Sequence, residues 1–197
     1  MTTERAGKIK RKTGETEIQM ELKLDGKGNY NIDTGVPFLD HMLTLFTVHG
    51  FFDLEIQAKG DTEVDDHHTV EDLGICLGQA FSKILGDKKG IARYGCCYLP
   101  MDETLIRVVV DLSNRPYLHY EVPISEQKVG TFDTQLAKEF MRAFSQHGGI
   151  TMHIDLLHGE NGHHIIEAVF KGLSRAISEA TRPLSGFDKA LSSKGSL

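Results

Sequence analysis

Apolar residues recur along the chain with two periods that follow each other in a fixed order. Residues 18–24 alternate between apolar and charged or amide side chains, which predicts a strand with one buried face. After a turn at 26–28, residues 30–32 predict the partner strand of a hairpin. From Pro37 the apolar spacing becomes that of a helix, which Gly50 is placed to end as its C′ residue.

The same order then occurs again. A strand over 52–58 and a helix with apolar positions from Val70 to Ile84 complete the first half, and residues 88–90 form the seam. In the second half we expect strands at 105–112, 118–122 and 150–157, and helices at 134–147 and 164–181. Neither half has enough faces to enclose a core alone. We therefore expect residues 1–90 and 91–197 to form one α/β body in which helices meet helices.

A polar pattern is repeated inside these matching halves. His41 and His49 are eight residues apart, as are Glu139 and His147 (49 − 41 = 147 − 139 = 8). The sequence H-H-x-x-E begins at His67 and again 96 residues later (163 − 67 = 96). A single copy is typical of a solvated helix start, where acidic residues are favoured. Two copies at matched positions instead indicate two pseudo-symmetric metal sites.

Helix geometry limits how each motif can bind metal. His67 and Glu71 are separated by four residues, so they share one helix face. Adjacent histidines point about 100° apart, and are poorly placed to chelate one ion together. The candidate ligands are nitrogen or oxygen donors without sulfur, which suits two Mn²⁺, Fe²⁺, Ni²⁺ or Zn²⁺ ions. They are His41, His67, His68, Glu71, Glu139, His163, His164 and Glu167.

Other metal motifs fit poorly. The chain has no H-E-x-x-H, which argues against a zincin protease. A ferritin-like di-iron site would need E-x-x-H and more carboxylates. His49 and His147 each precede a glycine at a helix end, where a structural role fits them equally well.

Composition narrows the class of protein further. The chain has 197 residues, of which 40% are hydrophobic and 25% charged, as in an ordinary globular protein. A net charge of −6 argues against a nucleic-acid or anionic-membrane partner. The three cysteines lack zinc-knuckle spacing and fit reduced thiols, so we expect a cytoplasmic protein. The polar start and the absence of a long apolar run argue against a signal peptide or membrane span.

Five segments resemble the imidazoleglycerol-phosphate dehydratase family of histidine biosynthesis. They are GVPFLDHM at 35–42, DDHHTVEDLG at 65–74, VGTFDTQL at 129–136, HHIIEAVFKG at 163–172 and SSKG at 192–195. The resemblance covers nearly the whole chain. It implies an α+β fold, with a helical layer sandwiched between two four-stranded sheets. It also implies a 24-subunit homo-oligomer with active sites at subunit interfaces and two Mn²⁺ ions per site.

The resemblance assigns roles to particular residues. All eight candidate ligands fall at the family's ligand positions, although the usual form of the motif has His where this chain has Glu139. Carboxylate oxygen also suits Mn²⁺. Glu15 corresponds to an acid/base, beside the catalytic ligands His41 and His68. Arg93, Arg115, Ser193, Lys194 and His49 correspond to substrate- and phosphate-binding positions, and we expect the tail from 182 to 197 to be mobile until it closes over substrate.

The implied reaction is dehydration of D-erythro-imidazole-glycerol phosphate to imidazole-acetol phosphate. Two metals would stabilise the deprotonated ring, so that hydroxide can leave through a diazafulvene-like intermediate. Two alternatives share the metal sites. A di-metal hydrolase of a phosphorylated metabolite would release phosphate, whereas a non-catalytic metal-binding shell would show no turnover.

Overall fold

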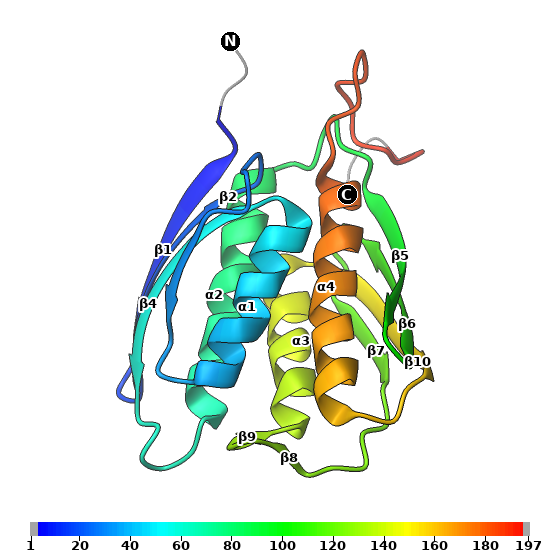
Figure 1. Ribbon diagram of the computed structural model, residues 1–197. Helices are drawn as coiled ribbons and strands as arrows, with labels where there is room; N and C mark the ends of the chain where they lie inside the picture. The colour runs from blue at the N-terminus through cyan, green and yellow to red at the C-terminus, as the bar shows by residue number, and fades with distance from the viewer. Residues whose placement is uncertain (1–3, 195–197) are drawn as a thin grey trace.

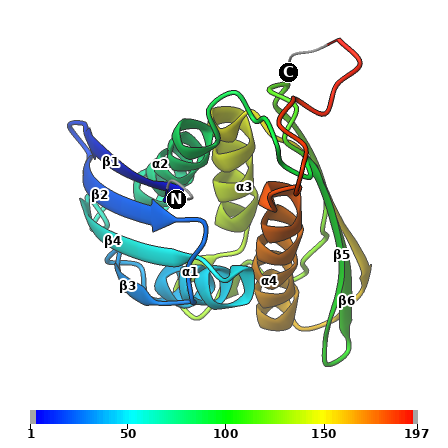
Figure 2. The same cartoon turned by 90° about the horizontal axis from the view of Figure 1, so that it is seen from above.

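Two four-stranded sheets enclose four helices within residues 4–194, the part of the chain that the computed structural model describes. Figure 1 shows the sheets on the two sides and the helices between them, and Figure 2 shows the same layers from above. The expected α+β fold with a helical layer between two sheets is confirmed.

The first sheet has the strand order β1-β2-β4-β3. Its strands are β1 (Ala6–Lys12), β2 (Thr16–Lys23), β3 (Tyr30–Asp33) and β4 (Asp53–Gly60). The helices of this half are α1 (Pro37–Gly50) and α2 (His67–Leu85).

The second sheet repeats this arrangement in the order β5-β6-β10-β7. Its strands are β5 (Tyr94–Met101), β6 (Thr104–Asp111), β7 (Tyr117–Glu121) and β10 (Thr151–His158). The helices are α3 (Gln135–Gly148) and α4 (Gly162–Thr181), and a small hairpin joins β8 (Lys128–Val129) to β9 (Phe132–Asp133). Each sheet combines two antiparallel pairings with one parallel pairing, so the two halves match strand for strand.

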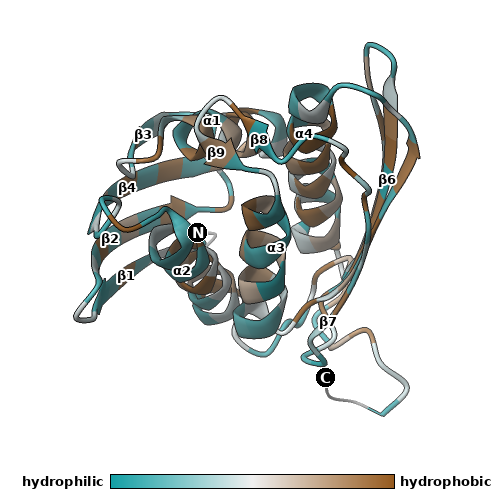
Figure 3. Ribbon diagram, turned by 90° about the horizontal axis from the view of Figure 1, so that it is seen from below, coloured by the Kyte–Doolittle hydropathy of each residue, from teal (hydrophilic) through white to brown (hydrophobic). Residues whose placement is uncertain are grey.

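One hydrophobic core joins the two halves. Figure 3 shows hydrophobic and hydrophilic residues alternating along the strands, and the buried ones face the helices. At the centre, the ring of Phe144 from α3 lies 6.4 Å from that of Phe46 and 5.5 Å from that of Phe81, both in the first half. Because these buried rings pack across the seam, neither half encloses its core alone.

Two glycines let α2 and α3 approach closely. A Cβ added at Gly74 would lie 2.7 Å from the carbonyl oxygen of Phe140, and one at Gly78 would lie 2.7 Å from the nitrogen of Gly148. The two glycines are four residues apart and therefore share one helix face. This face sets how α2 and α3 lie relative to each other.

Two local predictions are wrong. β3 pairs in parallel with β4, whereas the sequence predicted a hairpin with β2. The loop before β3 is tied to β4 instead, since the Asp53 carboxylate accepts hydrogen bonds from the backbone of Lys27 and Asn29 (2.8 and 2.9 Å). Gly50 remains within α1, and Phe51 takes the left-handed conformation (φ 58°). Gly50 is needed for space, because an added Cβ would lie 2.3 Å from the ring of Phe52.

The described part of the C-terminal tail contacts the seam, and its expected mobility before substrate binds stays a prediction. Isolated bridges join Ile91 to Pro183 and Lys89 to Ala190, and Ala190 is buried. The last residue of the SSKG segment, at position 195, and the two residues after it lie outside the described residues. None of the helices in the described part of the chain is long and apolar enough to cross a membrane.

We predict that Gly78→Ala destabilises the protein. The added methyl group would meet three backbone atoms of α3 within 3.0 Å, so the helices must separate. We expect the free energy of unfolding to fall by about 1–3 kcal/mol, despite the helix preference of alanine. Urea unfolding measures this, and Gly14→Ala is the control because an added Cβ there meets no atom within 4 Å. Equal stability of the two variants would contradict the packing argument.

Lys88 is a buried cation at the seam. Its side chain is 1% exposed, and Nζ donates to the carbonyl oxygens of Gly148 and Gly149 (3.3 and 3.4 Å) at the end of α3. Burial lowers the pKa of Lys88 to about 8. An unfolded lysine has a pKa of about 10.4, so between these two values the unfolded chain binds more protons than the folded chain. Raising the pH through this window therefore stabilises the fold.

We predict that the stability of the wild type relative to Lys88→Met increases between pH 8 and pH 10.4. The gain approaches about 3 kcal/mol, because only the wild type carries the shifted group. Urea unfolding of both proteins across this range measures the difference between their free energies of unfolding. The contributions of all other titrating groups are the same in both proteins and cancel in this difference. A difference independent of pH would show that Lys88 has an ordinary pKa.

Candidate functional site

Three predicted ligands from two helices converge near the first turn of α4. The ligand atoms of His41 in α1 and of His163 and Glu167 in α4 lie within 4.8 Å of one another. Glu167 Oε2 is 3.4 Å from His41 Nε2 and 3.3 Å from His163 Nε2. Among residues 4–194, this is the one group of three His, Cys, Asp or Glu side chains with such close ligand atoms. We call it the first cluster.

Contacts of helix α4 hold the side chains of this cluster in position. The Asn161 side chain caps the helix by accepting hydrogen bonds from the backbone of His163 and His164. Glu167, one turn after His163, is buried, and its Oε1 pairs with Lys171. Burial alone would raise the pKa of the Glu167 carboxyl, but hydrogen bonding and charge from Lys171, with the two histidines, lower it. The carboxylate is thus held ionised, with Oε2 directed at the histidines.

The matching residues of the other half form a second cluster on α2 and α3. His67 Nε2 lies 3.7 Å from Glu71 Oε2, and Glu71 Oε1 accepts a 2.8 Å hydrogen bond from Arg142. Arg142 also pairs with Glu139 Oε2 at 2.7 Å. Glu71 and Glu139 are thus joined through the guanidinium group of Arg142, and a shared metal site for them and His67 stays a prediction.

The second histidine of each pair has a carboxylate partner of its own. The ring planes of His67 and His68 are inclined by 87°, and those of His163 and His164 by 89°. His68 Nδ1 lies 3.0 Å from Asp61 Oδ2, and this hydrogen bond raises the pKa of His68. His164 Nδ1 lies 2.8 Å from Glu103 Oε2, which likewise raises its pKa.

Such contacts are typical of metal-binding histidines. A carboxylate on one ring nitrogen fixes the tautomer and directs the other nitrogen toward an ion. That adjacent histidines serve different ions stays a prediction. Nitrogen and oxygen donors without sulfur suit Mn²⁺, so the residues present fit this metal. Glu15 Oε1 lies 3.9 Å from His68 Nε2, which places the candidate acid/base beside a candidate ligand.

The candidate phosphate-binding residues lie in a different region. Arg93, Arg115, Ser193 and Lys194 line one cavity of about 820 Å³ between β5 and the tail. Arg93 forms two hydrogen bonds with the Asp111 carboxylate (2.7 and 3.0 Å) and a third with the backbone of Leu191. Arg115 is 67% exposed. The structure thus brings these four residues together, with Arg93 holding the tail in place.

His49 lies apart from that cavity, at the other end of α1 from its first turn. Burial, together with the charges of Lys171 and Arg175, lowers its pKa. Because the charges of Lys171 and Arg175 act on it, His49 lies near α4.

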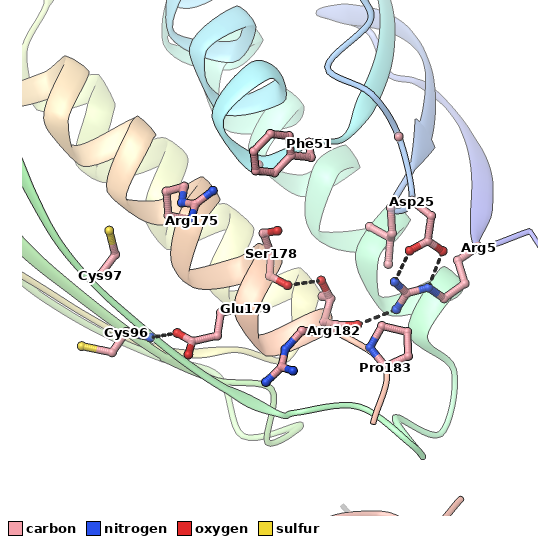
Figure 4. A pocket seen from close by; sticks show the side chains of 14 residues that line it. Arg5, Asp25, Phe51, Cys96, Cys97, Arg175, Ser178, Glu179, Arg182 and Pro183 are labelled. Atoms are coloured by element: carbon pink, nitrogen blue, oxygen red, sulfur yellow. Dashed lines mark hydrogen bonds and ion pairs between the residues drawn. The ribbon is translucent and has the colours of Figure 1, made fainter. Parts of the chain in front are cut away.

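A further cavity of about 670 Å³ was not predicted (Figure 4). It lies between the loop before β3, the end of α1 and the last turns of α4. Arg5 is fixed there by Asp25 and by the backbone of Thr181, and Arg175 lies over the ring of Phe51. We assign it no role.

Four residues in these clusters were missed by sequence reasoning. Lys171 follows Glu167 by four residues, and this spacing was a usable signal. Arg142 follows Glu139 by three residues, but its contact with Glu71 depends on the packing of α2 and α3. Asp61 and Glu103 come from loops and give no periodic signal.

Comparisons with known proteins point to one family. The sequence profile of a family described as imidazoleglycerol-phosphate dehydratase matches residues 34–177. A protein of that name from Desulfotalea psychrophila is 65% identical over 193 residues, covering 98% of this chain and 96% of the relative. Another, from Syntrophobacter fumaroxidans, is 56% identical over 201 residues and covers 100% of each chain.

Two solved structures of proteins with that name share the fold. The one from Staphylococcus aureus is 47% identical with a TM-score of 0.83, covering 90% of this chain and 99% of its own. The one from Pyrococcus furiosus is 38% identical with a TM-score of 0.83, covering 96% and 100%.

Proposed function

This chain belongs to the imidazoleglycerol-phosphate dehydratase family, the hydro-lyases of histidine biosynthesis, and from this premise we propose the details of its reaction and assembly. Its substrate is D-erythro-imidazole-glycerol phosphate, and its product is imidazole-acetol phosphate with the phosphate ester intact. The observation that carries the proposal is the convergence of His41, His163 and Glu167 on one point.

The two clusters, together with His68 and His164, would hold two Mn²⁺ ions per active site. Bound Mn²⁺ would supply Lewis acidity that stabilises the deprotonated imidazole ring of the substrate. Two carboxylates and one lysine of the protein would orient the candidate ligands. Asp61 and Glu103 orient the histidines through Nδ1, and Lys171 directs Glu167.

Glu15 is the proposed acid/base. It stands in the turn between β1 and β2, where its backbone N–H donates to Thr13 Oγ1 (3.1 Å). This turn places the carboxylate beside His68, within reach of a substrate ring bound there. Glu15 would take or return the proton of the carbon chain next to that ring.

One chain cannot supply both ends of the substrate site. The backbone N–H of Arg93 donates to the carbonyl of Ala180, which follows His163 by 17 residues of α4 (180 − 163 = 17). At 1.5 Å per residue, this separates the first cluster from the phosphate pocket by about 25 Å. Figure 1 shows the tail at the opposite end of α4 from its first turn. The glycerol chain between ring and phosphate is far shorter.

We therefore place each active site between copies of the chain. The metal-binding residues of one copy meet Arg93, Arg115, Ser193 and Lys194 of another. His49 adds to the substrate-binding residues. This need for several copies agrees with the proposed 24-subunit assembly, and the tail would close over the phosphate. The cytoplasmic location remains a prediction from the reduced cysteines, all three of which are free.

The first test is turnover by metal-stripped protein to which Mn²⁺ is restored. With imidazole-glycerol phosphate as substrate, we expect Mn²⁺-dependent formation of the keto product without free phosphate, because dehydration leaves the ester bond untouched. Assays of both products distinguish the alternatives. Phosphate release would support the hydrolase, and absence of turnover from assembled, metal-loaded protein would support the metal-binding shell.

A second test mixes two inactive variants. His163→Ala removes a metal ligand, and Arg115→Ala removes a phosphate-binding residue. If these residues serve one site from different chains, co-assembly at equal amounts leaves both intact in about a quarter of the sites. We expect activity to recover to about that fraction of the wild type. Mixed assemblies that stay inactive would show that both residues belong to a single chain's site.

A further inference from the structure

The buried and half-buried glutamates of the two clusters share one arrangement. Glu167 bonds Lys171 through Oε1 and faces the two histidines through Oε2. Glu71 bonds Arg142 through Oε1 and faces His67 through Oε2. In each case a cation holds one oxygen, while the other remains directed at the histidine side.

The two cations do not occupy matching positions in the repeat. Glu139 corresponds to His41 (139 − 41 = 98), so Arg142 corresponds to Thr44 (142 − 98 = 44). Arg142 is therefore not a duplicated residue. Arg142 lies in the second cluster, which has Glu139 where the first cluster has His41. The second cluster therefore contains one carboxylate more than the first.

Arg142 links two helices as well as two charges. Its Nη2 donates to Glu71 in α2 at 2.8 Å, while Nε donates to Glu139 in its own helix at 2.8 Å. Hydrogen bonding to Glu139, the largest cause, raises the pKa of Arg142. One planar guanidinium thus fixes two carboxylates, a task for which the single ammonium of lysine is poorly shaped.

We propose that Arg142 is a positioning residue of the second metal cluster, which holds Glu71 and Glu139 so that they and His67 can bind one Mn²⁺ ion together. The inference rests on the proposed Mn²⁺-dependent function. An ordinary surface ion pair would be the alternative, since the Arg142 side chain is 53% exposed and such pairs contribute little to stability. That alternative predicts no effect on metal binding.

The test measures Mn²⁺ binding to metal-stripped, full-length protein without substrate, by equilibrium dialysis and by the electron paramagnetic resonance of bound Mn²⁺. We expect Arg142→Gln to weaken one of the two bound ions by about 10–100-fold and to leave the other unchanged, as loss of a ligand-orienting contact does. Lys138→Gln is the matched control. This variant removes an exposed cation from the same helix. Lys138 pairs with neither Glu71 nor Glu139, which are both bound by Arg142.

A double variant separates positioning from general damage to the helix. Glu139→His removes the additional carboxylate that Arg142 holds. In that background, we expect Arg142→Gln to cause a loss of affinity about tenfold smaller than it causes alone. Equal losses in both backgrounds, or unchanged binding in Arg142→Gln, would overturn the proposal. Wild-type protein that binds no Mn²⁺ would instead reject the function on which it rests.

Discussion

The close contact of α2 with α3 at Gly74 and Gly78 is the constraint on which the second cluster depends. His67 and Glu71 come from α2, whereas Glu139 and Arg142 come from α3, so the distance between the helix axes sets the distance between the ligands. In the first cluster, α1 and α4 play these roles. The metal-binding residues are thus positioned by helix packing, and the loops contribute only supporting carboxylates such as Asp61.

The elements with strong periodicity could be predicted from the sequence, because one face of each packs on the core. β2, α2 and α4 are examples, and their apolar positions are buried. β1 was missed because lysines alternate there with Gly7, Ile9 and Arg11, so the strand has little apolar pattern and none of its residues is fully buried. The pairing of β3 with β4 is parallel and depends on contacts distant in sequence, so no turn signal could indicate it.

The candidate site shows the same division. The repeat of H-H-x-x-E was enough to predict candidate ligand types and a different direction for adjacent histidines, and the ring planes of each pair are close to perpendicular. The cations that hold the glutamates could not be predicted in the same way. Arg142 acts across two helices, and a sequence pattern on one helix does not reveal its second partner.

The distance along α4 has a consequence for how the protein behaves in a cell. A chain that has just been made, or one released by dilution, holds the candidate metal ligands at one end of this helix and the candidate phosphate-binding residues at the other. With each site placed between copies, as proposed above, chemistry would be a property of the assembly, and the amount of competent catalyst would depend on concentration more steeply than the amount of protein does. A mutation that weakens association would therefore resemble an active-site defect, even though every catalytic side chain remained intact.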